Sequence, residues 1–180
     1  MIFSGAKDIC VIYCFHDSRR VCAKCCADPF SVSEARPHMG GRHIARRDSA
    51  VEEQKLVTLA LEAQKAAYAP YSHFSVGAAL LCADGTVYTG CNIENAAYSC
   101  GICAERTAAA KAVSEGRRSF VMLAVAGSSD ALCTPCGLCR QFLLEFAPDL
   151  TVLCANRKGA YEKRTLRALL PGGFDSDSMA

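Results

Sequence analysis

The sequence predicts an α/β fold of three layers, an α/β/α sandwich with helices on both faces of a central sheet. Two observations lead to this prediction. Two kinds of segment follow one another along the chain. In one kind apolar and other residues alternate, as in strands, and in the other apolar residues recur at helical spacing. Hydrophobic residues also make up 51% of the 180-residue chain, which is enough for one sizeable core but hardly for two domains.

The first elements of the domain are a helix and a hairpin. The helix is expected to begin at Ser49, whose hydroxyl can cap it, and to end before Pro70. Its apolar stripe consists of Val51, Leu56, Leu59, Ala60 and Ala63. A strand with alternating apolar residues follows over 74–80, and the Asp-Gly pair at 84–85 predicts a hairpin turn into a second strand over 87–89.

Helices and strands alternate in the rest of the domain. The expected elements are helices at 103–115 and 136–146 and strands at 121–126 and 151–154. A final short helix is expected to start near Thr165 and to stop at the Pro-Gly-Gly sequence of 171–173.

Residues 1–49 differ in composition from the domain proper, which is expected to span 50–180. They hold cysteines at positions 10, 14, 22, 25 and 26 and a basic stretch at 42–47, without sustained periodicity. The Cys-x-x-Cys-Cys sequence at 22–26 can form half of a zinc site, but no second ligand pair with clear spacing lies nearby. We therefore interpret this segment as a poorly ordered leader, variable or non-native, with Met39 as an alternative start.

Composition argues against nucleic-acid and membrane partners. The net charge of +2 is too close to neutral for a strongly electrostatic binder of either. No apolar run approaches the ~20 residues of a membrane span. The apolar run at 9–15 is short for a signal peptide, only Lys7 precedes it, and Arg19 and Arg20 follow it in place of a small-residue cleavage site. The expected location is therefore the cytoplasm, where the thirteen cysteines are more often metal ligands or catalytic groups than disulfides.

Two short fragments carry the chemistry: Cys103-Ala-Glu105 and Pro135-Cys136-x-x-Cys139. Each lies at the expected start of a helix, where unpaired N–H groups and the helix dipole favour the thiolate that binds metals. Cys136 and Cys139 share one helix face because they are three residues apart, and Cys103 can add a third sulfur. Three thiolates leave one tetrahedral position of a zinc ion open for water, whose protons Glu105 can move if the metal lies beyond the helix tip.

The three thiolates make such a centre negative, and a positive group is expected beside it. The two helix dipoles and Arg106 can compensate this charge. Arg106 is equally well interpreted as an exposed helix residue that pairs with a carboxylate.

Two other interpretations of the cysteines remain open at this point. Cys100 together with Cys103, Cys136 and Cys139 spells a four-thiolate structural zinc site, which would belong to a non-catalytic binding module. Cys133, Cys136 and Cys139 are spaced like ferredoxin ligands, but Leu143 stands where the fourth ligand of an iron–sulfur cluster is expected.

The motifs closely resemble those of the homotetrameric cytidine deaminases with a three-cysteine zinc site. The matching stretches are 69–80, 90–96, 103–108, 135–141 and 169–174, and the resemblance covers roughly residues 50–175. It implies a mixed sheet of about five strands, one Zn²⁺ per chain and a homotetramer that serves pyrimidine salvage. It also implies hydrolytic deamination of cytidine and deoxycytidine to uridine and deoxyuridine.

The resemblance implies roles for individual residues. Cys103, Cys136 and Cys139 would bind zinc, and Glu105 would shuttle protons while zinc-bound hydroxide attacks C4 of the base. The residues implied in substrate binding are Asn92 and Glu94 at the ribose 3′-hydroxyl, Phe74 as an aromatic wall, the backbone N–H of Ala104 or Cys103 at the base, and Phe174 in a neighbouring subunit's pocket. Without the resemblance, a core position is the favoured interpretation for both phenylalanines, and Asn92 can be a turn residue and Glu94 a surface charge.

A blasticidin-type deaminase is the second enzyme that fits a three-cysteine zinc core. The sequence Asn92-Ile-Glu94-Asn95 favours a ribosyl substrate and therefore cytidine. Nucleotide and RNA-editing deaminases generally use a histidine form of the motif, so a nucleic-acid substrate is not expected.

Overall fold

The computed structural model describes residues 46–179 of the chain. The leader expected over 1–49 lies outside the described residues except for its last four. None of the helices in the described part has the length and apolar character that crossing a membrane requires.

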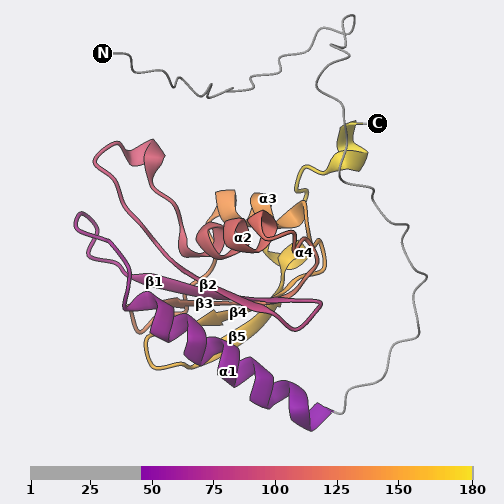
Figure 1. The fold of residues 1–180 in the computed structure, drawn as a ribbon, viewed down its shortest axis with the longest axis horizontal. Helices are drawn as coiled ribbons and strands as arrows, with labels where there is room; N and C mark the ends of the chain where they lie inside the picture. Colours follow the sequence, from indigo (N-terminus) through magenta and orange to yellow (C-terminus); the bar gives the residue numbers. More distant parts are fainter. Residues whose placement is uncertain (1–45, 180) are drawn as a thin grey trace, which may run out of the picture. The chain divides into compact units, whose positions relative to one another are not determined.

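A single mixed sheet forms the centre of the domain (Figure 1). Its strands are β1 (Val76–Cys82), β2 (Val87–Cys91), β3 (Phe120–Gly127), β4 (Thr151–Ala155) and β5 (Tyr161–Thr165). They lie in the order β2-β1-β3-β4-β5, and only β3 and β4 are parallel neighbours. The expected mixed sheet of about five strands is confirmed.

Helices cover both faces of this sheet. Helix α1 (Arg46–Gln64) packs on one face, whereas α2 (Ala104–Ser114) and α3 (Gly137–Leu144) lie on the other, with the short α4 (Leu166–Leu169) beside them (Figure 1). Because the side chains of a strand point alternately to the two faces, the sheet supplies two separate cores. Ala79 and Leu153 belong to the core under α1, and Leu80 and Val152 to the core under α2 and α3. The three-layer α/β/α prediction is confirmed.

The boundaries of α1 differ from those expected. Within the described residues the helix already includes Arg46, so Ser49 lies inside it and the prediction that Ser49 caps it is wrong. It ends at Gln64, six residues before Pro70. The chain leaves the helix early because the Tyr68 backbone N–H donates to the Asn92 carbonyl over 3.0 Å and its carbonyl accepts from the Glu94 N–H over 2.8 Å.

The buried face of α1 is also shifted from the expected stripe. Leu56 and Ala60 are buried as expected, but Leu59 is 40% exposed and Val57 takes its place in the core. The helix lies very close to the sheet, because Gly77 of β1 faces the Ala60 carbonyl oxygen where any Cβ would overlap it. This close packing selects which residues of the helix point inward.

Strand β5 was not among the individual strands that we predicted from sequence patterns. Its five residues, Tyr161–Thr165, lie at an edge of the sheet, and four of them are exposed. Charged side chains are common on exposed edge strands, and they hide the alternating apolar pattern that identifies a strand.

The connections of β2 determine where the site forms. The expected hairpin is confirmed, with Gly85 at φ 86° in the turn between β1 and β2. After β2, the loop that leads to α2 carries a short 3₁₀ helix (Tyr98–Cys100) and projects from the sheet (Figure 1). Two backbone hydrogen bonds between Ile93 and Ile102 close the base of this loop. The start of α2 is thereby held next to the segment that follows β2.

Candidate active site

Three cysteine sulfurs gather at the starts of α2 and α3. Cys103 is the N-cap residue of α2, Cys136 is the N-cap of α3, and Cys139 lies in the first turn of α3. The three Sγ atoms lie within 4.8 Å of one another, and those of Cys103 and Cys136 are 3.7 Å apart. Two sulfurs of a tetrahedral zinc site with bonds of about 2.3 Å lie about 3.8 Å from each other. The donor set and its spacing therefore fit a zinc ion.

The fold supports neither the four-thiolate structural zinc site nor the iron–sulfur cluster, because the additional cysteines that they require lie outside the sulfur group. Among residues 46–179, the group of potential metal ligands contains Cys103, Cys136 and Cys139, and neither Cys100 nor Cys133 belongs to it. Cys100 is exposed in the projecting loop, and Cys133 is half-buried before α3. Three protein ligands leave the fourth position of a tetrahedral zinc open, as in catalytic rather than structural sites.

Arg106 supplies positive charge beside the sulfurs. Its Nη2 lies 3.9 Å from Cys103 Sγ, and its buried Nε has no hydrogen-bond partner among the described residues. The Cys139 thiol, then Arg106, lowers the pKa of Cys103 to about 5. One thiolate is therefore already favoured near neutral pH, whereas the hydrogen bond to Cys103 and burial raise the pKa of Cys139.

Glu105 is a buried carboxyl in the first turn of α2. Only 3% of its surface is exposed. Burial, reinforced by the negative charge of Cys103, raises the pKa of Glu105 to about 7. A carboxyl with this pKa exchanges a proton readily near neutral pH, which is the property of a general acid and base.

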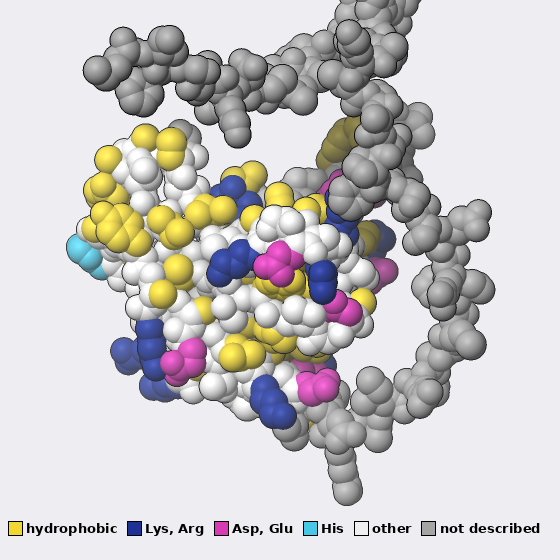
Figure 2. Space-filling model, in the orientation of Figure 1, with side chains coloured by type: hydrophobic (Ala, Val, Ile, Leu, Met, Phe, Trp, Pro, Cys, Tyr) yellow, Lys and Arg dark blue, Asp and Glu magenta, His cyan; other side chains and the backbone are white. Residues whose placement is uncertain are grey.

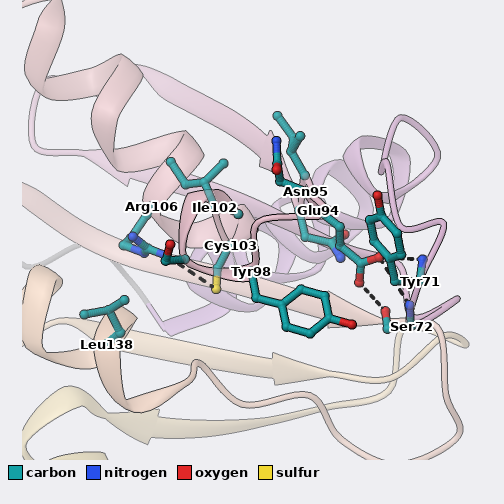
Figure 3. Close-up of a pocket in the computed structure, with 13 residues that line it drawn as sticks. Tyr71, Ser72, Glu94, Asn95, Tyr98, Ile102, Cys103, Arg106 and Leu138 are labelled. Atoms are coloured by element: carbon teal, nitrogen blue, oxygen red, sulfur yellow. Dashed lines mark hydrogen bonds between the residues drawn. The ribbon is translucent and has the colours of Figure 1, made fainter.

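A pocket of about 620 Å³ has Cys103 and Arg106 in its lining, whereas Glu105, Cys136 and Cys139 do not line it. Figure 3 shows Cys103 and Arg106 toward one end, Glu94 with Ser72 and Tyr71 toward the other, and the ring of Tyr98 between them. The volume is in the range of small-molecule sites.

The two polar residues predicted to bind the ribose both line this pocket. The Glu94 carboxylate accepts hydrogen bonds from the Ser72 hydroxyl and from the backbone N–H groups of Tyr71 and Ser72. These bonds, that of the Ser72 hydroxyl first, lower the pKa of Glu94. Asn92 donates to the Phe74 carbonyl over 2.9 Å and accepts from the Val76 N–H over 2.8 Å. Both side chains are thus held in place and keep acceptor or donor capacity for a ligand.

The remaining predicted substrate residues do not line this pocket. Ala104 is the fully buried first residue of α2. Phe74 is 38% exposed, and the tip of its ring reaches Gly127 at the end of β3. Phe174 is 58% exposed beyond α4, outside the pocket of its own chain.

Sequence reasoning missed the apolar part of the lining. Tyr98 is 84% exposed and Leu138 62% exposed, and Ile93 and Ile102 also border the pocket. Figure 2 shows hydrophobic side chains gathered over the loop between β2 and α2. These residues come from two separate segments, the loop between β2 and α2 and the start of α3, and follow no periodic pattern, so spacing offers no signal for them. Ser72 is recognisable only through its hydrogen bonds to Glu94.

Comparison with known proteins assigns this site to a family. A family model described as the cytidine and deoxycytidylate deaminase zinc-binding region matches residues 50–155, more than half of the chain. The chain belongs to the cytidine and deoxycytidylate deaminase family. Its cofactor is zinc, and the three-cysteine group is the candidate site that fits it among the described residues.

Individual members of the deaminase family resemble the chain over most of their length. The cytidine deaminase of Sporosarcina psychrophila is 49% identical over 72% of this chain and 96% of the relative. A probable cytidine deaminase of Dictyostelium discoideum is 46% identical over 71% of this chain and 87% of the relative. The crystal structure of cytidine deaminase from Burkholderia pseudomallei matches with a TM-score of 0.65 and 44% identity, over 67% of this chain and 97% of that one.

Proposed function

We propose that this protein catalyses the hydrolytic deamination of cytidine and deoxycytidine to uridine and deoxyuridine, with one zinc ion per chain. The observation that carries the proposal is the gathering of three cysteine sulfurs within 4.8 Å of one another, with the buried carboxyl of Glu105 in hydrogen-bond contact with Cys139. The relatives named above are cytidine deaminases that the chain matches over most of their length. We assign the activity to residues 50–180.

Cys103, Cys136 and Cys139 would hold the zinc. When bound, zinc supplies Lewis acidity that lowers the pKa of a nucleophilic water. Cys103, whose pKa is lowered to about 5, already favours the thiolate form that this binding requires. Arg106 offsets part of the negative charge of the thiolates, because its guanidinium lies 3.9 Å from Cys103 Sγ.

Glu105 would move the protons of the reaction. Hydrolytic deamination needs a proton at N3 of the base and, later, a proton on the departing amine. A carboxyl whose pKa is raised to about 7 by burial can take one proton from the attacking water and give it to N3, and later take the remaining hydroxyl proton and give it to the departing amine. The burial of Glu105 also keeps bulk water from competing for these transfers.

The nucleoside would lie in the pocket with its base toward Cys103 and its sugar toward Glu94. Asn92 and Glu94 would bind the 3′-hydroxyl, and both are oriented by hydrogen bonds to neighbouring backbone. The N–H of Ala104 belongs to a helix start, where N–H groups lack intrahelical partners and can serve the base. Phe74 would flank the base. A blasticidin-type substrate lacks the ribose 3′-hydroxyl for which the Asn92–Glu94 pair is proposed.

The same proposal includes a homotetramer that works in pyrimidine salvage in the cytoplasm. Exposed apolar side chains at Tyr98, Leu138 and Phe174 support an assembly in which neighbouring subunits cover them. Phe174 would then enter a neighbour's pocket. The cysteines of the described part are all free thiols, which suits a reducing compartment.

The test is turnover of purified protein, followed by the absorbance change as cytidine becomes uridine, together with the zinc content per chain. Cytidine, deoxycytidine and blasticidin S are compared under the same conditions. We expect one zinc per chain and turnover of both nucleosides, with blasticidin S the poorest substrate. A zinc-loaded protein that turns over none of the three would overturn the proposal.

A further inference from the structure

The hydroxyl of Thr107 connects the start of α2 to the end of β2. Its Oγ1 lies 3.1 Å from the carbonyl oxygen of Cys103 and 3.2 Å from that of Cys91. The first contact is the ordinary bond of a helical threonine to the residue four positions earlier. The second reaches another element, because Cys91 is the last residue of β2. Since both acceptors are carbonyl oxygens, the single hydroxyl proton is shared between them.

The backbones of α2 and β2 are in close contact at the same place. A Cβ at Gly90 would lie 2.5 Å from the Ala104 carbonyl oxygen and 2.6 Å from the Ala108 nitrogen. It would also lie 2.9 Å from the Thr107 Cβ, so the absence of a side chain at Gly90 allows this approach. The glycine sets how close the helix comes, while the Thr107 hydroxyl can fix its position along the strand.

The connected segments carry the two ends of the site. The first turn of α2 contains Glu105 and Arg106 and follows Cys103, whereas β2 runs directly into Asn92 and Glu94. A shift of α2 along β2 would therefore move the sulfur and the carboxyl relative to the residues at the other end of the pocket.

We propose that Thr107 is a positioning residue that fixes the zinc and proton-transfer end of the site relative to its sugar-binding end through the Cys91 carbonyl. The expected effect of Thr107 on turnover rests on the proposed function. Thr107 itself does not line the pocket. Groups that orient a metal ligand from outside the coordination shell commonly change metal affinity or activity 10- to 100-fold when removed.

Thr58 provides a matched control. Its Oγ1 donates to the Gln54 carbonyl over 2.9 Å, the same contact to the residue four positions earlier, on the opposite face of the sheet. Among the described residues its hydroxyl makes no bond to another element. Thr58→Val therefore removes the helical bond alone, whereas Thr107→Val also removes the link to β2.

The experiment compares zinc-loaded Thr107→Val, Thr107→Ser and Thr58→Val with the wild type. The readouts are kcat and KM for cytidine and the rate at which a chelator removes zinc. For Thr107→Val we expect roughly tenfold lower kcat with little change in KM and roughly tenfold faster zinc release. Thr107→Ser, which keeps the hydroxyl, should stay within about threefold of the wild type in both readouts, as should Thr58→Val.

The inference is overturned if Thr107→Val and Thr58→Val behave alike in zinc release and kcat, or if serine fails to rescue. Should Thr107→Val not fold, Thr107→Ala replaces it, with the same expectations. Zinc release separates this test from that of the proposed function. If the wild type turns over no pyrimidine nucleoside, the proposed function fails, but the zinc-release comparison still decides the role of Thr107.

Discussion

The side-chain amide of Gln141 holds the backbone of Phe174 with two hydrogen bonds. Its Nε2 donates to the Phe174 carbonyl oxygen over 2.6 Å, and its Oε1 accepts from the Phe174 N–H over 3.2 Å. Gln141 belongs to α3, two residues after Cys139. The helix that carries two of the proposed zinc ligands therefore also fixes where the aromatic ring near the chain end is presented.

Gln141→Glu should weaken substrate binding without loss of zinc. A carboxylate can accept from the Phe174 N–H but cannot donate to its carbonyl, so the tail loses one bond and gains a repulsion. We expect KM for cytidine to rise by roughly three- to tenfold, in line with about 1 kcal/mol for a hydrogen bond. Phe174→Ala should raise KM at least as much, and the double variant should add little to it. Fully additive effects would contradict a shared role.

Arg106→Gln should lower both zinc retention and turnover. The substitution removes the positive charge beside Cys103 and leaves the thiolates less compensated. We expect a 10- to 100-fold loss of kcat/KM and faster zinc release to a chelator. Arg118→Gln, an exposed arginine just beyond α2, is the control for charge removal and should leave both readouts unchanged. Equal behaviour of the two variants would show that Arg106 does not serve the metal.

Cys100→Ala and Cys103→Ala separate the catalytic from the structural interpretation of the cysteines. Because Cys100 lies outside the sulfur group, its replacement should leave one zinc per chain and turnover within about twofold, as for an ordinary exposed site. Cys103→Ala should lose zinc and turnover together. Zinc content is measured by atomic absorption on purified protein. Loss of zinc in Cys100→Ala would establish a fourth thiolate ligand.

Gly77→Ala should destabilise the fold without reaching the site directly. Its Cβ would overlap the Ala60 carbonyl oxygen, so α1 must move away from the sheet. We expect the free energy of unfolding to fall by about 2–3 kcal/mol in denaturant titrations. Gly137→Ala is the control, because a Cβ there meets nothing within 4 Å. A stability of Gly77→Ala equal to that of the control would contradict the close packing of α1.

The sequence was most informative where function depends on short spacings. Cys136 and Cys139 lie three residues apart at a helix start, and Cys103 precedes Glu105 by two, so local geometry already limits where the sulfurs can point. The alternating apolar residues of β1 and the turn at Gly85 likewise depend on near neighbours. These features were predicted because the physical constraint and the sequence pattern cover the same few residues.

What the sequence could not predict depends on contacts between distant segments. The end of α1 is set by Tyr68 pairing with Asn92 and Glu94, and β5 exists because Tyr161–Thr165 pairs with β4. The bonds from Ser72 to Glu94 and from Thr107 to Cys91 join residues far apart in the chain. No periodicity or spacing encodes such contacts, since they form only when the layers pack.

Turnover and zinc content of Glu105→Gln test whether Glu105 moves the protons of a deamination reaction at the three-cysteine zinc site. Glutamine keeps the shape of the side chain but cannot carry the proton, while Cys103, Cys136 and Cys139 remain to bind zinc. We expect one zinc per chain and a 10²- to 10⁴-fold or greater loss of kcat for cytidine. A zinc-loaded Glu105→Gln protein that deaminates cytidine at the wild-type rate would contradict this role of Glu105.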